Sequence, residues 1–183
     1  MKAPPLLRTI VFLLVVLPVW LPAAQVDYYL KISDIEGESD AKNHKGEIEL
    51  DSFAWGMRRE PELTGQGSKF VVDQIVIKKA IDKSTPRLML ACATGAPVPE
   101  VQLIVTRPNP KGTGDPVVFL KITMTDVLVT SYQTGGSSGD VVPVDSFSLN
   151  FEKIELEYTP YNRETGEAEG SVSFHYDVTQ PPT

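Results

Sequence analysis

Few side chains of this sequence belong to the types that carry out catalytic chemistry. It contains two histidines, His44 and His175, and a single cysteine, Cys92. His44 falls in a polar segment and His175 on the wet side of an alternating stretch, so both are expected to be solvated surface residues. Cys92 has no base or cation near it in the sequence, which a reactive thiolate would need. We therefore expect Cys92 to pack as a small buried hydrophobe.

An acidic run, Asp34, Glu36, Glu38 and Asp40, is the one motif that suggests a metal. It lacks the later ligands and the terminal glutamate of a calcium loop, so a solvated face is the better interpretation. A Ser-His-Asp triad or a pair of catalytic carboxylates is assembled in space and stays open, but no local signature supports either. We expect no catalytic site, no cofactor and no metal, with a hydrolase as a distant alternative.

The composition is that of one globular domain with an acidic surface. The chain has 183 residues, of which 42% are hydrophobic and 22% charged, and its formal net charge is -7. One cysteine excludes an internal disulfide framework. The negative charge argues against nonspecific binding to nucleic acid, because such binding requires a positive surface.

Residues 1–24 differ from the rest of the chain. They hold two bases, Lys2 and Arg8, no acid, and an apolar run from Ile10 to Leu17 that is followed by small residues. This pattern predicts a secretory signal peptide over 1–24, a mature domain over 25–183, and a secreted or periplasmic protein. The alternatives are an uncleaved anchor, which would be the chain's only membrane contact, and a miscalled start codon that leaves a cytoplasmic protein before secretion.

The mature chain predicts a curved antiparallel sheet. Apolar residues alternate with a period of two, which is typical of strands. Their parity changes between Leu50 and Phe53, and again between Phe151 and Ile154. Such a change marks a bulge or bend, so we expect the sheet to curl into a barrel. The predicted strands cover residues 26–32, 48–55, 70–79, 101–106, 117–129, 147–151, 154–158 and 171–178, and residues 36–46 are expected to form an exposed loop.

One short helix is predicted at about residues 85–94. Ser84 and Thr85 can cap its start, Pro86 suits the first helical position, and Gly95 suits the exit. The apolar residues between them predict that the helix plugs an open end of the barrel. Cys92 lies among them.

Several ordered blocks resemble the hemolysin-coregulated protein (Hcp) family, which forms the tube of the bacterial type VI secretion system. No single block is decisive, but their combined order across about residues 26–178 is specific. The strongest blocks are Leu88-Met89-Leu90-Ala91-Cys92-Ala93-Thr94-Gly95 and Asp126-Val127-Leu128-Val129-Thr130-Ser131-Tyr132-Gln133-Thr134-Gly135-Gly136. Others are Ile35-Glu36-Gly37-Glu38-Ser39, His44-Lys45-Gly46-Glu47-Ile48-Glu49 and Ser52-Phe53-Ala54-Trp55-Gly56.

The resemblance implies a mainly β fold, an antiparallel barrel of the Hcp type with one short helix, that forms homohexameric rings. It implies rings stacked into a hollow tube that carries small effectors, works with sheath and spike proteins, and is itself secreted. It implies no enzymatic activity. The loop after the first strand takes part in ring stacking in the family, and here it contains Glu36, Gly37, Glu38, Ser39, His44, Lys45 and Gly46.

The leader departs from the family pattern, because family tubes assemble in the cytoplasm. The alternative interpretation is therefore an exported, stand-alone binding module that has the Hcp-like barrel and no role in a tube.

Overall fold

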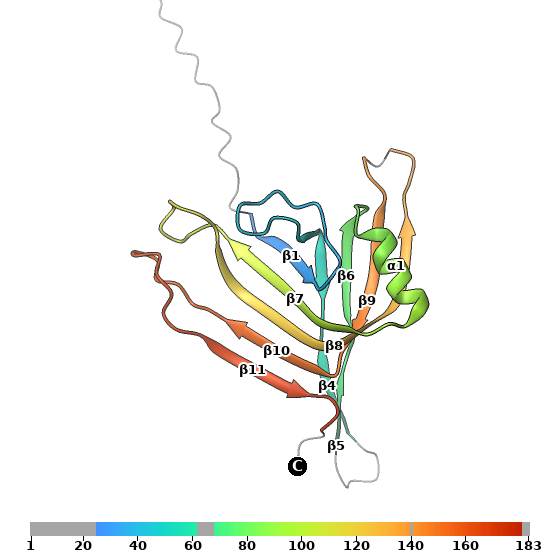
Figure 1. Cartoon of the computed structure of the whole chain (residues 1–183). Helices are drawn as coiled ribbons and strands as arrows, with labels where there is room; N and C mark the ends of the chain where they lie inside the picture. Colours follow the sequence, from blue (N-terminus) through green and yellow to red (C-terminus); the bar gives the residue numbers. More distant parts are fainter. Residues whose placement is uncertain (1–24, 62–67, 140, 181–183) are drawn as a thin grey trace, which may run out of the picture.

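A computed structural model describes residues 25–61, 68–139 and 141–180 of the chain, so the predicted signal peptide over 1–24 lies outside the described residues. Figure 1 shows a curved, mostly antiparallel sheet with one helix, α1, along its side. The hydrogen-bonded order of the main sheet is β2-β1-β7-β8-β9-β6-β3, with β10 and β11 branching from β8. The strands are β1 Asp27–Ile32, β2 Ile48–Leu50, β3 Ser52–Ala54, β4 Met57–Pro61, β5 Ser68–Val72, β6 Ile75–Ala80, β7 Val98–Arg107, β8 Val117–Gly135, β9 Val144–Asn150, β10 Lys153–Tyr158 and β11 Val172–Asp177.

The barrel closes at Asp51, where the first parity change was predicted. β2 pairs with β1 and β3 pairs with β6, so the two ends of the sheet order are joined through this one residue. The Asp51 N–H donates to the Lys78 carbonyl at 2.9 Å, which carries the hydrogen bonding across the corner. The predicted bend is confirmed, and it turns one alternating segment into two strands with different partners.

β8 belongs to both halves of the molecule. Residues 120–125 pair with β10 and residues 128–135 pair with β9 on the same edge. Asp126 lies between these two segments with a φ of 53°, in the left-handed region that side chains other than glycine rarely adopt. On this side of Asp126, β10 and β11 continue the sheet outward from residues 120–125 of β8, and we call β10 and β11 the wing (Figure 1).

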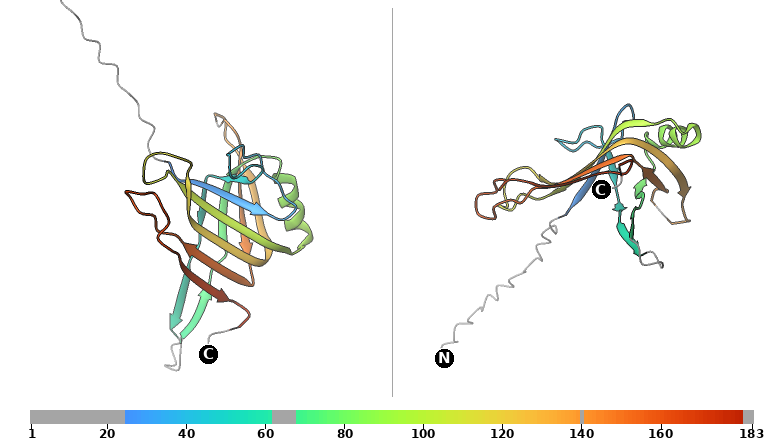
Figure 2. Two further views of the ribbon diagram at one scale, coloured as in Figure 1. Left: turned by 60° about the vertical axis from the view of Figure 1, so that its left-hand side comes forward. Right: turned by 90° about the horizontal axis from the view of Figure 1, so that it is seen from below.

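A hairpin of β4 and β5, called the arm below, is a correction to the predicted strands. The sequence predicted one strand over 70–79, but β5 ends at Val72 and β6 begins at Ile75. β4 was not predicted, because all five of its residues are exposed and its sequence shows no alternation. Figure 2 shows the arm projecting from the end of the barrel opposite the β8–β9 connection. One ring contact, Phe70 edge-on to Tyr176 with centroids 4.9 Å apart, links it to β11.

The core is built from the inward faces of nearly every strand of the barrel. Its fully buried members include Leu30, Ile77, Leu103, Phe147 and Leu149. Burial of each such side chain contributes about 1.5–3 kcal/mol relative to its exposed state. These residues occupy alternate positions of their strands, as the period of two predicted.

Helix α1, Thr85–Thr94, matches the predicted bounds, and its details differ in two ways. Ser84 makes no side-chain capping bond, so that prediction is wrong, whereas Gly95 ends the helix with a φ of 63° as expected. Leu88 is the fully buried apolar residue of α1, and Cys92 packs half-buried against the core. Leu90 is 56% exposed, so the helix covers the flank of β8 and contributes little more than Leu88 to filling the barrel.

Candidate assembly site

The 36–46 loop folds back on itself and is more ordered than the exposed loop that was predicted. Gly37 N–H donates to Gly46 O at 2.8 Å, Gly46 N–H to Ser39 O at 2.8 Å, and Ser39 N–H to Glu47 O at 3.1 Å. Gly37 and Ser39 are buried. A Cβ at Gly37 would lie 2.3 Å from Glu47 O, so only glycine fits where the loop crosses the start of β2.

His44 corrects the expectation of a solvated surface residue. Its ring stacks on Tyr29 with centroids 4.2 Å apart, and its Nδ1 lies 2.8 Å from a carboxylate oxygen of Glu47. Only 12% of its side chain is exposed. Burial, with nearby carboxylates led by Asp27, raises the pKa of Tyr29. Its stacking on Tyr29 means that His44 fastens the loop to β1, whereas His175 is exposed as predicted.

The acidic run of the loop faces the turn that precedes α1. Glu38 accepts a hydrogen bond from the backbone N–H of Lys83 at 3.0 Å, and the Lys83 ammonium lies 3.1 Å from Glu36. A groove of about 370 Å³ runs between these groups and Lys45. Within the described part of the chain no three His, Cys, Asp or Glu side chains are placed to hold a metal ion, and the carboxylates of Glu36 and Glu38 contact protein donors.

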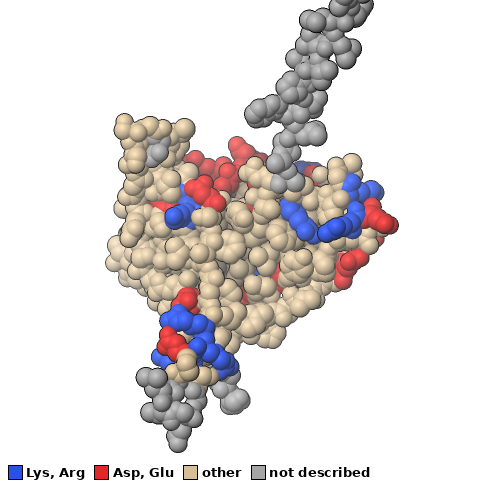
Figure 3. All heavy atoms as spheres, turned by 180° about the vertical axis from the view of Figure 1, so that it is seen from behind, with Lys and Arg blue, Asp and Glu red and all other residues tan. Residues whose placement is uncertain are grey.

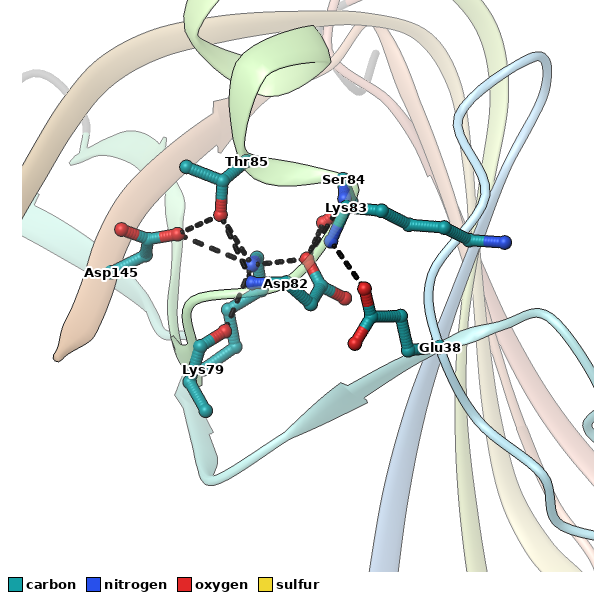
Figure 4. A network of polar contacts seen from close by, with 8 residues as sticks. Glu38, Lys79, Asp82, Lys83, Ser84, Thr85 and Asp145 are labelled. Carbon is teal, nitrogen blue, oxygen red and sulfur yellow. Dashed lines mark hydrogen bonds and ion pairs between the residues drawn. The ribbon is translucent and has the colours of Figure 1, made fainter. Parts of the chain in front are cut away.

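Behind this turn lies a buried polar cluster that the sequence analysis did not identify (Figure 4). Lys79 and Asp145 are both 0% exposed and form an ion pair at 3.2 Å. The Lys79 ammonium also lies 2.7 Å from Asp82 and donates to the Thr85 hydroxyl at 3.1 Å. Thr85 in turn donates to Asp145 at 2.5 Å. The cluster joins β6, β9 and the start of α1, and the alternation of β6 could have indicated it, because Lys79 continues the inward positions of Ile75 and Ile77.

The surroundings of Asp145 favour its charged form. Burial would raise the pKa of Asp145, but its polar neighbours, first Thr85 and then Tyr132, Thr134 and Lys79, together lower it below its usual value. Burial, reinforced by Asp145, raises the pKa of Tyr132 far above its usual value, so this hydroxyl stays protonated. One oxygen of the Asp145 carboxylate therefore accepts from Thr85 of α1 and pairs with Lys79 of β6, while its other oxygen has no hydrogen-bond partner among the described residues.

A second feature is the apolar face of the wing. Cross-strand pairs join core residues of the barrel to apolar residues of the wing. One such row runs from Leu103 and Ile122 in the core to Leu156 and Phe174 on the wing. The next row ends at Val172, which is 69% exposed. Figure 3, from behind, shows a broad area without charged side chains between the charges of the arm and those of the opposite end. The face that fills the barrel thus emerges from it without a covering element among the described residues.

The same architecture occurs in known proteins. A family model described as "Type VI secretion system effector, Hcp" matches residues 29–158, which is most of the chain. The chain belongs to the Hcp family. The curated "Protein hcp1" of Pseudomonas aeruginosa is 34% identical over 161 residues, which are 85% of this chain and 96% of that protein. The family resemblance predicted from the ordered blocks is therefore confirmed, and the stand-alone binding module receives no support.

Solved Hcp structures agree with the fold. Hcp1 of Salmonella typhimurium has a TM-score of 0.67 at 28% identity, covering 84% of this chain and 95% of its own. A type VI secretion system effector of Yersinia pestis has a TM-score of 0.66 at 28% identity, covering 83% of this chain and 100% of its own. This Hcp chain is a tube protein of the type VI secretion system, a class that self-assembles and is secreted. The described residues contain no helix long and apolar enough to cross a membrane.

Proposed function

We propose that this Hcp protein closes into a homohexameric ring in which the apolar face of the wing contacts the next subunit. Tyr158 and Val172 end this face, and both are exposed in the single chain. An exposed apolar surface that is continuous with the buried core is typical of a protein–protein interface. The wing occupies one side of the subunit, so its contact with a different surface of the neighbour is head-to-tail and can close a ring.

We further propose that rings stack end to end into a tube through the 36–46 loop and the arm. The loop lies at one end of the barrel and the arm projects from the other (Figure 1). A contact between opposite ends of a subunit does not close on itself, so it generates an open stack. The arm of a subunit in the adjacent ring would contact this loop. The stacking residues proposed from the sequence are Glu36, Gly37, Glu38, Ser39, His44, Lys45 and Gly46.

The same role makes a catalytic site, a cofactor and a nucleic-acid partner unnecessary, and we propose that the protein has none of them. His44 is occupied by Tyr29 and Glu47, and Cys92 packs against the core. The proposed partners are other copies of the chain, sheath and spike proteins, and small effectors inside the tube. We retain the proposal of a signal peptide over residues 1–24 and of a secreted or periplasmic mature domain.

One pair of variants tests the ring interface. Val172→Asp places a charge on the apolar face, and Ser173→Asp places the same charge on the polar face one residue along β11. Both positions are exposed, so each change should alter the stability of the subunit by less than about 0.5 kcal/mol. We expect native mass spectrometry and electron microscopy to find hexamers for the wild type and for Ser173→Asp, and monomers for Val172→Asp. Wild-type monomers at every concentration would overturn the ring, and intact Val172→Asp rings would overturn the interface.

A second pair tests stacking. Glu36→Lys reverses a charge on the 36–46 loop, and Glu155→Lys makes the same reversal on the polar face of the wing. We expect both proteins to form rings and only Glu36→Lys to lose long tubes in electron micrographs. Tubes of normal length in Glu36→Lys would remove the loop from the stacking contact.

A further inference from the structure

The buried cluster is larger than the stability of the barrel requires. Lys79 is shared between Asp145 and Asp82, which places two carboxylates against one ammonium in the interior. Replacement of a buried ion pair by apolar side chains of similar volume is often neutral or stabilising. A barrel that needed only stability would therefore be served as well by an apolar residue at position 79, which shares the inward parity of Ile75 and Ile77.

The geometry of the cluster instead specifies the position of one turn. Lys79 holds Asp82 from below, and Asp82 accepts hydrogen bonds from the N–H and the hydroxyl of Ser84 at 2.9 and 2.5 Å. These bonds fix the backbone on both sides of Lys83. The Lys83 N–H points outward to the carboxylate of Glu38, as Figure 4 shows.

We infer that Lys79 is a positioning residue for the 36–46 loop, acting through the Asp82–Ser84 turn on Glu38. The chain of contacts runs without a break from the buried ammonium of Lys79 to the loop carboxylate, and each step is a hydrogen bond or ion pair of 2.5–3.0 Å. Asp145 anchors the inner end of this chain to β9. The inference rests on the proposed stacking role of the loop only for its consequence in the tube, where the loop would be held in a fixed position for contact with the next ring.

Hydrogen exchange of the 36–46 loop tests the inference directly. Lys79→Met removes the ammonium, and we expect exchange of the loop amides to accelerate about tenfold or more, while amides of β7 remain protected. Glu38→Ala should produce a similar acceleration, and the double variant should add nothing to it, because both residues act along one path. Lys78→Met is the matched control, since it makes the same substitution at the exposed neighbouring position of β6 and should leave exchange of the loop close to wild type.

A second variant guards against general loss of folding. Lys79→Met with Asp145→Leu replaces the buried pair by apolar side chains and should fold, yet its loop should still exchange rapidly. Wild-type loop protection in this double variant, or additive effects of Lys79→Met and Glu38→Ala, would overturn the positioning role. If the loop is released and electron microscopy still finds normal tubes, the positioning role stands and the proposed stacking role of the loop fails.

Discussion

At the scale of single residues, two glycines of the 36–46 loop are required for different reasons. Gly37 passes so close to Glu47 and Ile48 that a Cβ has no room, whereas Gly46 has open space and a φ of 76°. The first position therefore excludes every side chain, and the second excludes only residues that resist the left-handed conformation.

We predict that Gly37→Ala destabilises the protein by about 1–3 kcal/mol, because the added methyl group forces the loop away from β2. Gly46→Asn should cost less than about 1 kcal/mol, since asparagine adopts the left-handed region more readily than other residues. Urea unfolding of the two variants beside the wild type measures both values. Equal losses would show that backbone conformation, and not space, governs both positions.

Asp145 gives the molecule a predictable response to acid. Its pKa is lowered in the folded state, so its contribution to stability is present above the usual pKa of about 3.9 and is lost as the pH falls through the folded value. We predict that the free energy of unfolding of the wild type decreases as the pH falls below about 4. Asp145→Asn removes one of the two carboxylates that pair with Lys79 and leaves Asp82, so it should be less stable than the wild type at pH 7 by about 1.5–3 kcal/mol. The difference between the two proteins should narrow in acid. Urea unfolding from pH 2.5 to 7 measures the free energies of unfolding of both proteins. A difference that stays constant with pH would show that Asp145 is not the source of the acid sensitivity.

At the scale of elements, helix α1 is attached to the barrel mainly by one fully buried side chain. Leu88 reaches the core, while Leu90, two residues on and therefore on the opposite face of the helix, is exposed to solvent. We predict that Leu88→Ala destabilises the protein by about 2–5 kcal/mol and that Leu90→Ala changes stability by less than about 0.5 kcal/mol. Thermal and urea unfolding check both. A large effect of Leu90→Ala on an isolated subunit would mean that the exposed face of α1 packs on something within the chain.

Sequence patterns predicted the elements whose two faces differ and missed those whose faces do not. The alternation in β6, β9 and β10 reflects one buried and one wet face, so these strands were predictable. β4 is exposed on both faces and carries no such signal. The bend at Asp51 was predictable from the change of parity, while the break between β5 and β6 is marked only by two consecutive polar residues, Asp73 and Gln74, between apolar runs.

The candidate site was predictable only in part, for a related reason. The ordered family blocks placed the 36–46 loop, but local polarity suggested a solvated loop and a solvated His44. The contacts that correct this prediction, Tyr29 under His44 and Lys83 against Glu38, join residues separated by 15 and 45 positions. The buried cluster likewise depends on Asp145 lying beside Lys79, a proximity created by the pairing of β6 with β9.

At the scale of the whole molecule, the leader makes a prediction about the mature protein. If residues 1–24 are a signal peptide, the protein isolated from the outer compartments of its own host begins at Gln25, just before β1. N-terminal sequencing and an intact mass measure this. A protein that retains Met1 would instead support an uncleaved anchor, and one that begins with an initiator methionine in place of a residue near Val26 would support a later start.

The closure of the barrel at Asp51 has a kinetic consequence. β1 must find β7, and β6 must find β9, across about 70 residues of intervening chain in each case, before the corner can join the two ends of the sheet. Sheets that depend on such distant partners fold in milliseconds to seconds, far more slowly than helical bundles. A chain with this topology stays open for longer after synthesis. If residues 1–24 are a signal peptide, that delay would keep the chain unfolded for passage through a translocation channel, and the barrel would close only after export.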